Sequence, residues 1–308
     1  MIGFILAAGF GTRLKPLTDH LPKALVPVCG APALSHIIND FKNGGINHIG
    51  VNSHYLHEQL VAYQSLSPRA FELFHEAEKI RGTGGAFAFA RCFLSTEDSF
   101  CVRNVDIIAD LNFMQLKEKF FAAKADVALV VVPSGKKPTV YYDAQTKEYR
   151  GTAPNSEAVG GEFIGTAFYS RRFLECITSD DFSIVPVWAR AKASGLTVCV
   201  IEVPALYWND IGTPAGLAQV HFDVLDQKCT LAIPAGMTVD YSHRVAFNSL
   251  LPEHEKTSLG EYCWIEPSDF FVDKRTARCI VMARSKMNLQ TQIDNTILTP
   301  WGAIPFEL

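Results

Sequence analysis

The chain has 308 residues, of which 48% are hydrophobic and 19% are charged, and its formal net charge is −4. This balance is typical of a soluble globular protein and argues against a nucleic-acid-binding protein, which usually carries a basic surface. No run of eighteen apolar residues occurs, so the sequence predicts no membrane-spanning helix.

Strand-like and helix-like segments alternate over the first part of the chain. The strand-like segments span residues 2–8, 48–53, 71–75, 99–105 and 126–132, and the helix-like segments span 33–43, 56–64, 84–93 and 111–124. This alternation predicts βαβ units and an α/β fold, with a Rossmann-like, mainly parallel sheet covered by helices on both faces.

The pattern changes towards the C-terminus. Residues 141–168 read as short strands and turns, followed by a helix over 184–194 and a strand over 196–203. A helix is then predicted up to about residue 227, with Pro214 as its first residue and Thr213 as its cap. Beyond it, short apolar clusters at 262–265, 279–282 and 296–298 fit either stacked coils of a short left-handed β-helix or a plain β-rich tail. We therefore predict a main domain over 1–228 and a small β-rich extension over 229–308.

Eight cysteines are spread along the chain, and no two of them form a Cys-x-x-Cys pair. This spacing argues against zinc ribbons and thioredoxin-like redox sites. The histidines His54 and His57 have no further metal-spaced partner nearby in the sequence. The apolar N-terminus lacks a basic segment and a small-residue cleavage site, so we expect a strand there and not a signal peptide. Together these features predict reduced thiols in a cytoplasmic protein.

The segment after the first predicted strand is the most informative part of the chain. It reads Leu6-Ala-Ala-Gly-Phe-Gly-Thr-Arg-Leu-Lys-Pro-Leu-Thr18 and is followed by Pro22-Lys-Ala-Leu-Val-Pro-Val28. Its glycines allow close approach of an anionic ligand, and its cations can balance the charges of a nucleoside triphosphate. It is not a Walker A loop, because no Gly-Lys-Ser/Thr follows, and Leu14 stands where a dinucleotide fingerprint needs its third glycine.

The whole run from Leu6 to Val28 resembles the signature loop of the sugar-1-phosphate nucleotidyltransferases. Asn104-Val-Asp106 and Trp208-Asn-Asp-Ile-Gly-Thr213 resemble the two aspartate motifs of that family, although most relatives carry glycine where Val105 stands. The resemblance is strongest to the N-acetylmuramate-1-phosphate uridylyltransferase and mannose-1-phosphate guanylyltransferase types. It implies condensation of UTP or GTP with a sugar 1-phosphate, with release of pyrophosphate, in the synthesis of nucleotide sugars such as cell-envelope precursors.

The resemblance also implies roles for individual residues. Arg13 and Lys23 are the expected catalytic cations, and Asp106 and Asp210 are the expected ligands of Mg²⁺, which suits sites with one or two carboxylates. Asn104, Gly165 and Thr166 are the expected sugar-binding residues. The expected nucleotide-binding residues are Leu6, Ala7, Ala8, Gly9, Gly11, Thr12, Arg13, Lys23, Glu76, Gly82, Thr83 and Gly84.

Several alternatives stay open at this point. Asp106 could be a turn residue or a helix cap, and Lys15 is a weaker candidate for phosphate binding than Arg13 or Lys23. The absence of a Glu-Lys-Pro tripeptide argues against the thymidylyltransferase branch. A cytidylyltransferase acting on phosphocholine and a non-catalytic regulatory or assembly subunit are the alternative functions. The C-terminal extension is a candidate for homo-oligomer formation.

Overall fold

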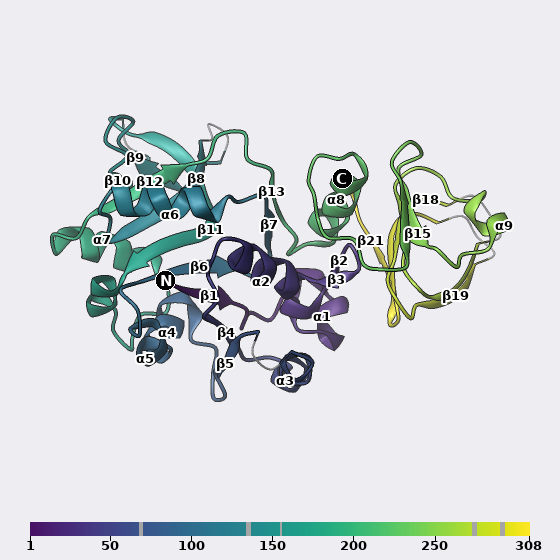
Figure 1. The fold of residues 1–308 in the computed structure, drawn as a ribbon, viewed down its shortest axis with the longest axis horizontal. Coiled ribbons are helices and arrows are strands. Elements are labelled where there is room, and N and C mark those ends of the chain that lie inside the picture. The colour runs from purple at the N-terminus through teal and green to yellow at the C-terminus, as the bar shows by residue number, and fades with distance from the viewer. Residues whose placement is uncertain (68–69, 134–136, 155, 273–275, 290–292) are drawn as a thin grey trace. The chain divides into compact units, whose positions relative to one another are not determined.

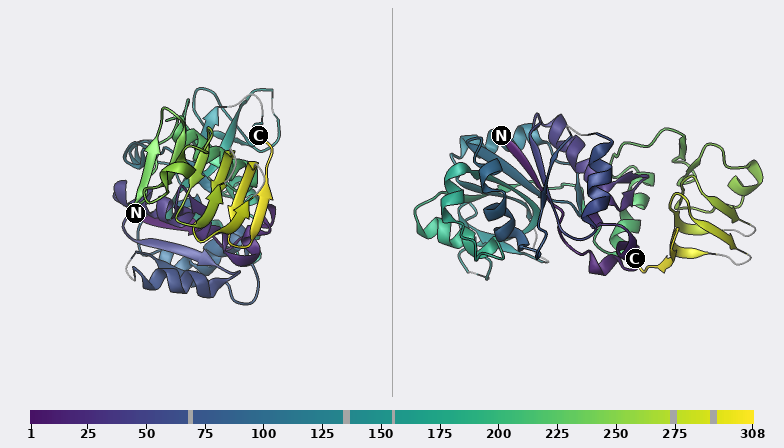
Figure 2. Two further views of the ribbon diagram at one scale, coloured as in Figure 1. Left: turned by 90° about the vertical axis from the view of Figure 1, so that its right-hand side faces the viewer. Right: turned by 90° about the horizontal axis from the view of Figure 1, so that it is seen from below.

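The structure is a computed structural model, which describes residues 1–67, 70–133, 137–154, 156–272, 276–289 and 293–308. The described chain forms two compact units, which Figure 1 and Figure 2 show as ribbons. The first unit contains residues 1–9, 37–107 and 111–206, and the second contains residues 10–36, 108–110 and 207–308. The chain therefore passes from one unit to the other several times, first at residue 10.

The first unit is built on one sheet, in which nine strands pair among the described residues. Strands β5 (Glu72–His75), β4 (Ile49–Ser53), β1 (Ile2–Leu6) and β6 (Ser99–Asn104) run parallel to their neighbours. Strands β8 (Val127–Pro133) and β12 (Val198–Glu202) are also parallel, whereas β11 (Val159–Ser170) runs antiparallel between β6 and β8. The short strands β9 (Val140–Tyr142) and β10 (Tyr149–Gly151) complete the sheet beside β11.

Helices cover both faces of this sheet. One buried cluster contains Phe87 of α4 (Gly82–Phe89), Leu94 of α5 (Arg91–Leu94) and Trp188 of α7 (Val185–Ala193). The same cluster contains Phe4 of β1 and Phe100 and Val102 of β6. On the other face, Phe113 and Phe120 of α6 (Phe113–Ala122) pack against Phe168 of β11. The remaining elements of the unit include α2 (Ala33–Asn43) from Ile37 onward, α3 (His57–Ser65) and the 3-10 helix η3 (Arg171–Cys176).

The second unit begins with the signature loop. This loop contains three short helical turns, η1 (Thr12–Leu14), α1 (Leu17–His20) and η2 (Lys23–Leu25), followed by the hairpin strands β2 (Pro27–Val28) and β3 (Ala31–Pro32). Strand β13 (Trp208–Asp210), which pairs with β7 (Ile107–Ala109), leads into α8 (Pro214–Leu225). Leu14, Leu17 and Val28 share a buried cluster with Leu217 and Val220 of α8, so loop and helix have a common core.

The C-terminal part of the second unit consists of stacked strands. Strands β15 (Val245–Asn248), β16 (Cys263–Ile265), β18 (Ala277–Val281) and β20 (Asp294–Thr299) pair in parallel, and Figure 2 shows them side by side. A second parallel pair consists of β17 (Asp269–Val272) and β19 (Lys286–Leu289). This stacking is the pattern that successive coils of a β-helix produce. Strands β14 (Met237–Asp240) and β21 (Gly302–Pro305) and the short helix α9 (Glu253–Lys256) complete this part.

The predicted fold class, an α/β sheet followed by a β-rich extension, is confirmed. Thr213 caps α8 by accepting a hydrogen bond from the Gly216 N–H at 3.1 Å, and Pro214 is the first helical residue, as predicted. Some predicted bounds differ from the observed ones. The helix predicted over 111–124 begins at Phe113, because the Asn112 side chain caps its first turn through the Gln115 N–H at 3.1 Å. The helix predicted over 84–93 is two helices, which meet at Ala90.

The division of the chain at residue 228 stays a prediction. In the part of the chain that the structure describes, no helix is long and apolar enough to span a membrane.

His221 of α8 forms a hydrogen bond with the β2–β3 hairpin inside the second unit. Its side chain is fully buried, with Nε2 accepting a hydrogen bond from the Cys29 N–H at 2.9 Å and Nδ1 donating to the Leu217 carbonyl at 2.9 Å. Burial, with a smaller contribution from His36, lowers the pKa of His221 to about 4. The imidazole is therefore neutral in the folded protein under conditions where an unfolded histidine gains a proton.

The pH dependence of stability tests this interaction. An unfolded histidine takes up a proton below pH 6.5, whereas folded His221 does so only near pH 4, so its contribution to stability is present above pH 6.5 and is lost as the pH falls to 4. We expect the free energy of unfolding of the wild type to fall by roughly 3 kcal/mol more than that of His221→Gln over this range. Urea denaturation at a series of pH values measures this difference. If the free energies of unfolding of the two proteins changed equally with pH, this would contradict a neutral, buried His221.

Candidate active site

Two motif segments, 7–9 and 105–106, begin where strands β1 and β6 of the first unit end. Strands β1 and β6 are parallel neighbours, Leu6 lies opposite Asn104, and the Val105 N–H donates to the Leu6 carbonyl at 3.1 Å. The segments that follow, 7–9 and 105–106, therefore start from the same edge of the sheet. This edge carries the carboxyl ends of parallel strands, where open α/β sheets bind their ligands.

A chain of buried hydrogen bonds fixes the start of the signature loop. The Ala7 N–H donates to Asn52 Oδ1 at 2.6 Å, and Asn52 Nδ2 donates to Glu76 Oε1 at 2.8 Å. The second carboxylate oxygen of Glu76 accepts from the Arg81 N–H at 2.7 Å, directly before α4. Two segments predicted to bind the nucleotide, the one at Ala7 and the one that starts at Gly82, are thus positioned by the same two side chains.

Glu76 is 0% exposed, and both of its carboxylate oxygens accept hydrogen bonds from the protein. These contacts support a positioning role, and its predicted contact with the nucleotide stays a prediction. Sequence reasoning missed Asn52, its partner. The signal was present, since Asn52 is a polar residue that follows the apolar start of β4, a strand in which all five residues are buried.

The glycines at the start of α4 are required by close packing. Gly82 has φ +67°, and a Cβ on it would lie 2.2 Å from the Phe182 carbonyl oxygen, whereas the Gly84 N–H donates to that oxygen at 3.1 Å. Thr83 Oγ1 accepts a hydrogen bond from the Ile184 N–H at 2.8 Å. This turn therefore holds the start of α4 against the segment that precedes α7, and its contact with the nucleotide remains predicted.

Two of the predicted sugar-binding residues line one cavity of the first unit. Gly165 has φ +64°, and a Cβ there would lie 2.7 Å from Asn104 Nδ2, so only glycine leaves room for the Asn104 amide. The cavity measures about 210 Å³. Its thirteen lining residues are Leu6, Thr83, Phe87, Val102, Asn104, Phe163, Gly165, Ala167, Tyr169, Ser183, Ile184, Val185 and Trp188.

Thr166, the third predicted sugar-binding residue, does not line this cavity. It is fully buried opposite Arg103 of β6, and its Oγ1 has no hydrogen-bond partner among the described residues. Arg103 itself was missed by sequence reasoning. Its buried guanidinium donates to Asp40 Oδ2 at 2.5 Å and to the Ile107 carbonyl at 3.0 Å, and so holds the turn that contains Asp106.

In the second unit, the structure brings Arg13 and Asp210 together. Both terminal nitrogens of Arg13 donate to Asp210 Oδ2, at 3.2 and 3.1 Å, and Asp210 Oδ1 accepts from the Gly212 N–H at 2.7 Å. A Cβ on Gly212 would lie 2.5 Å from the Arg13 guanidinium, which explains the glycine in the Asp-Ile-Gly-Thr run. The Arg13 and Asp210 side chains are 56% and 37% exposed, so the pair is accessible to solvent.

Other residues of the signature loop adopt defined positions around Arg13. Gly11 has φ +64°, and its carbonyl accepts from the Thr18 hydroxyl at 2.8 Å. Lys23 is half-buried in the first position of η2, after Pro22. Among the described residues no group of three or more His, Cys, Asp or Glu side chains could hold a metal ion. Mg²⁺ is usually held by one or two carboxylates together with substrate phosphates and water, and the predicted roles of Asp106 and Asp210 as its ligands stay predictions.

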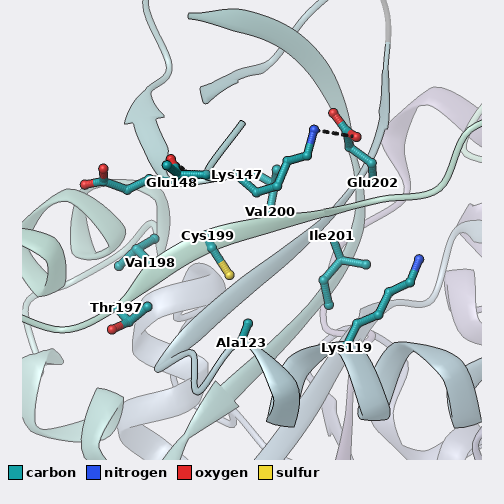
Figure 3. A pocket seen from close by; sticks show the side chains of 11 residues that line it. Lys119, Ala123, Lys147, Glu148, Thr197, Val198, Cys199, Val200, Ile201 and Glu202 are labelled. Carbon is teal, nitrogen blue, oxygen red and sulfur yellow. Dashed lines mark hydrogen bonds and ion pairs between the residues drawn. The ribbon is translucent and has the colours of Figure 1, made fainter. Parts of the chain in front are cut away.

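A larger groove of about 450 Å³ lies beside β12 in the first unit, and Figure 3 shows its lining side chains. Lys147 and Glu202, two of these residues, form an ion pair at 2.8 Å. Burial raises the pKa of the Cys199 thiol to about 11, which keeps it protonated and unreactive. The groove contains none of the predicted site residues, so volume alone does not identify the site.

The family model "Nucleotidyl transferase" matches residues 2–227. The chain belongs to the nucleotidyl transferase family. The resemblance stated from the sequence motifs is thereby confirmed.

Similar curated proteins of this family are mannose-1-phosphate guanylyltransferases. The catalytic subunit beta from Xenopus tropicalis is 28% identical over 225 residues, which cover 70% of this chain and 62% of that protein. The match thus spans less than two-thirds of the frog protein. The probable mannose-1-phosphate guanylyltransferase 1 from Oryza sativa subsp. japonica is 28% identical over 323 residues, which cover 97% of this chain and 86% of that protein.

Solved structures show the same fold. A putative glucose-1-phosphate thymidylyltransferase from Bacillus anthracis, in complex with a sucrose, has a TM-score of 0.62 at 18% identity and covers 75% of this chain and 97% of its own. HddC from Yersinia pseudotuberculosis has a TM-score of 0.60 at 21% identity and covers 71% of this chain and 98% of its own.

The Glu76 hydrogen bonds can be tested by substitution. Glu76→Ala leaves the buried Arg81 N–H and the Asn52 amide without their acceptor, so we expect the free energy of unfolding to fall by about 2–3 kcal/mol. The exposed Glu78 is a matched control, and Glu78→Ala should change stability by less than about 0.5 kcal/mol. Urea denaturation measures both variants. Equal, small effects would show that the buried network does not order this segment.

Proposed function

We propose that this chain condenses a nucleoside triphosphate with a sugar 1-phosphate to give a nucleotide sugar and pyrophosphate. The observation that supports it most directly is the Arg13–Asp210 pair, in which the expected phosphate-binding cation and an expected metal ligand lie together within a matched family domain. GTP is the first candidate nucleotide, because the similar curated proteins are named guanylyltransferases, and UTP is the second. We place this reaction in the cytoplasm, where nucleoside triphosphates are available.

The proposed reaction is an in-line displacement at the α-phosphorus. A phosphate oxygen of the sugar 1-phosphate forms a new bond to this phosphorus while the bond to the bridging α–β oxygen breaks, and pyrophosphate leaves. Both substrates are polyanions, so the protein has to neutralise the charge of their phosphates and hold the attacking oxygen in line with the α-phosphorus. The Arg13 fork suits bidentate contacts with the β- and γ-phosphates, and the compact charge of Lys23 suits the region of the α-phosphate.

Asp106 and Asp210 are the proposed ligands of Mg²⁺, which when bound offsets phosphate charge. Asp210 then has two competing partners, since its Oδ2 is paired with Arg13. An exposed ion pair is worth only about 0–1 kcal/mol, so its loss costs little. When a triphosphate binds, its phosphates can replace the Asp210 carboxylate as the partner of Arg13, and this carboxylate can then bind the metal. Nucleotide and metal should therefore bind cooperatively.

Pyrophosphate release tests the proposed function. The full chain is assayed with Mg²⁺ and each of GTP, UTP and CTP against a panel of sugar 1-phosphates, with phosphocholine as a further acceptor. We expect turnover with a sugar 1-phosphate and GTP or UTP. Turnover only with CTP and phosphocholine would favour the cytidylyltransferase alternative, and nucleotide binding without any turnover would favour a non-catalytic subunit.

Substitution of the two loop lysines tests the predicted catalytic cations. Removal of a charge that acts in the transition state typically lowers kcat by about 10²–10³, and we expect this loss for Lys23→Ala. Lys15 is exposed and pairs with Asp19 at 2.8 Å, so Lys15→Ala is a matched control that should stay within about threefold of the wild type. Similar losses in both variants would mean that the loop contributes only net positive charge.

A further inference from the structure

The cavity beside Asn104 and Gly165 has an exposed end and a buried, apolar end, which we call its closed end. Ser183 and Val185 are exposed lining residues, whereas Phe87, Tyr169 and Trp188 are no more than 2% exposed. The mouth therefore lies near the start of α7, and the cavity extends from there towards the core of the first unit. Its volume of about 210 Å³ exceeds the roughly 150 Å³ of an engineered cavity that admits benzene, so its volume is sufficient for a six-membered ring.

The closed end contains no charged side chain and few groups that can form hydrogen bonds with a ligand. None of the thirteen lining residues is Asp, Glu, Lys or Arg. The two polar atoms at this end bond to each other, because Trp188 Nε1 donates to the Tyr169 hydroxyl at 3.2 Å. Phe87, Val102 and Phe163 supply further apolar surface. A charged group placed here would lose its hydration without compensation, whereas a methyl group would gain from burial.

Polar groups that can orient a sugar lie elsewhere in the lining. The Asn104 side chain, held over Gly165, makes no hydrogen bond to other described residues. Thr83 Oγ1 accepts from the Ile184 N–H, which leaves its hydroxyl proton available for donation. One amide and one hydroxyl suffice to bind ring hydroxyls and to set the orientation of a pyranose.

We propose that the acceptor is a sugar 1-phosphate whose sugar carries no further charged group and directs a methyl-bearing substituent, such as a 6-deoxy carbon or an N-acetyl group, into the closed end of this cavity. This inference rests on the proposed function, because it takes the cavity as the acceptor site. It goes further by assigning specificity to the closed end. Amino sugars and uronic acids, which carry a charge, are poor acceptors.

Matched acceptors test the proposal on the full-length protein. Mannose 1-phosphate is compared with its 6-deoxy form, glucosamine 1-phosphate with its N-acetyl form, and glucuronic acid 1-phosphate serves as the anionic member. We expect the methyl-bearing member of at least one pair to have a kcat/KM about tenfold higher or more, with the charged members lowest. Equal values within both pairs, or preference for a charged acceptor, would overturn the proposal. Turnover with no sugar 1-phosphate would overturn the proposed function itself.

A charge introduced into the lining tests whether the acceptor binds in this cavity. Val185 is 36% exposed in the first turn of α7, where an aspartate is favourable for the helix, so Val185→Asp should fold. We expect it to lower the preference for N-acetylglucosamine over glucosamine 1-phosphate by at least about tenfold, with KM for the nucleotide unchanged. Lys119→Ala, in the groove beside β12, is the control and should leave the preference unchanged. The opposite pattern would assign the acceptor to that groove and overturn the proposal.

Discussion

The candidate site depends on a core shared by two segments that are far apart in the sequence. Leu14, Leu17 and Val28 of the signature loop pack in one buried cluster with residues of α8, and the Arg13–Asp210 pair spans 197 positions of the chain. Apolar burial supplies the free energy that keeps the two segments together, whereas the exposed ion pair adds little of its own. The polar side chains are thus held by the core beneath them and stay accessible to ligands.

The same constraint explains residues with no chemistry of their own. Gly212 leaves space for the Arg13 guanidinium, and a Cβ there would lie 2.5 Å from it. The buried, neutral His221 joins α8 to the hairpin that follows Lys23. In the first unit, Glu76 and Asn52 have a corresponding role for the segments at Ala7 and Arg81. In both units, buried polar groups fix the backbone from which the predicted ligand-binding groups extend.

Local patterns allowed most elements to be predicted. The continuous apolar runs gave the positions of β1, β6 and β8, Thr213 and Pro214 marked the start of α8, and the apolar clusters near 264, 280 and 297 gave β16, β18 and β20. The motifs identified the family. Bonds between distant residues could not be predicted, because nothing local pairs Asn52 with Glu76 or Arg103 with Asp40. For the same reason the apolar closed end of the cavity, formed by β6, β11, α4 and α7, emerged only from the structure.

We propose that Arg13 and Asp210 exchange their mutual ion pair for a triphosphate and a metal ion when both ligands bind. Calorimetric titration of GTP and UTP into the wild type and Asp210→Asn, with and without Mg²⁺, tests this exchange. We expect Asp210→Asn to bind nucleotide in metal-free buffer at least as tightly as the wild type, because Arg13 has lost its carboxylate partner, and to gain little affinity from Mg²⁺. Weaker metal-free binding by the variant, with the full gain from Mg²⁺ retained, would contradict the account.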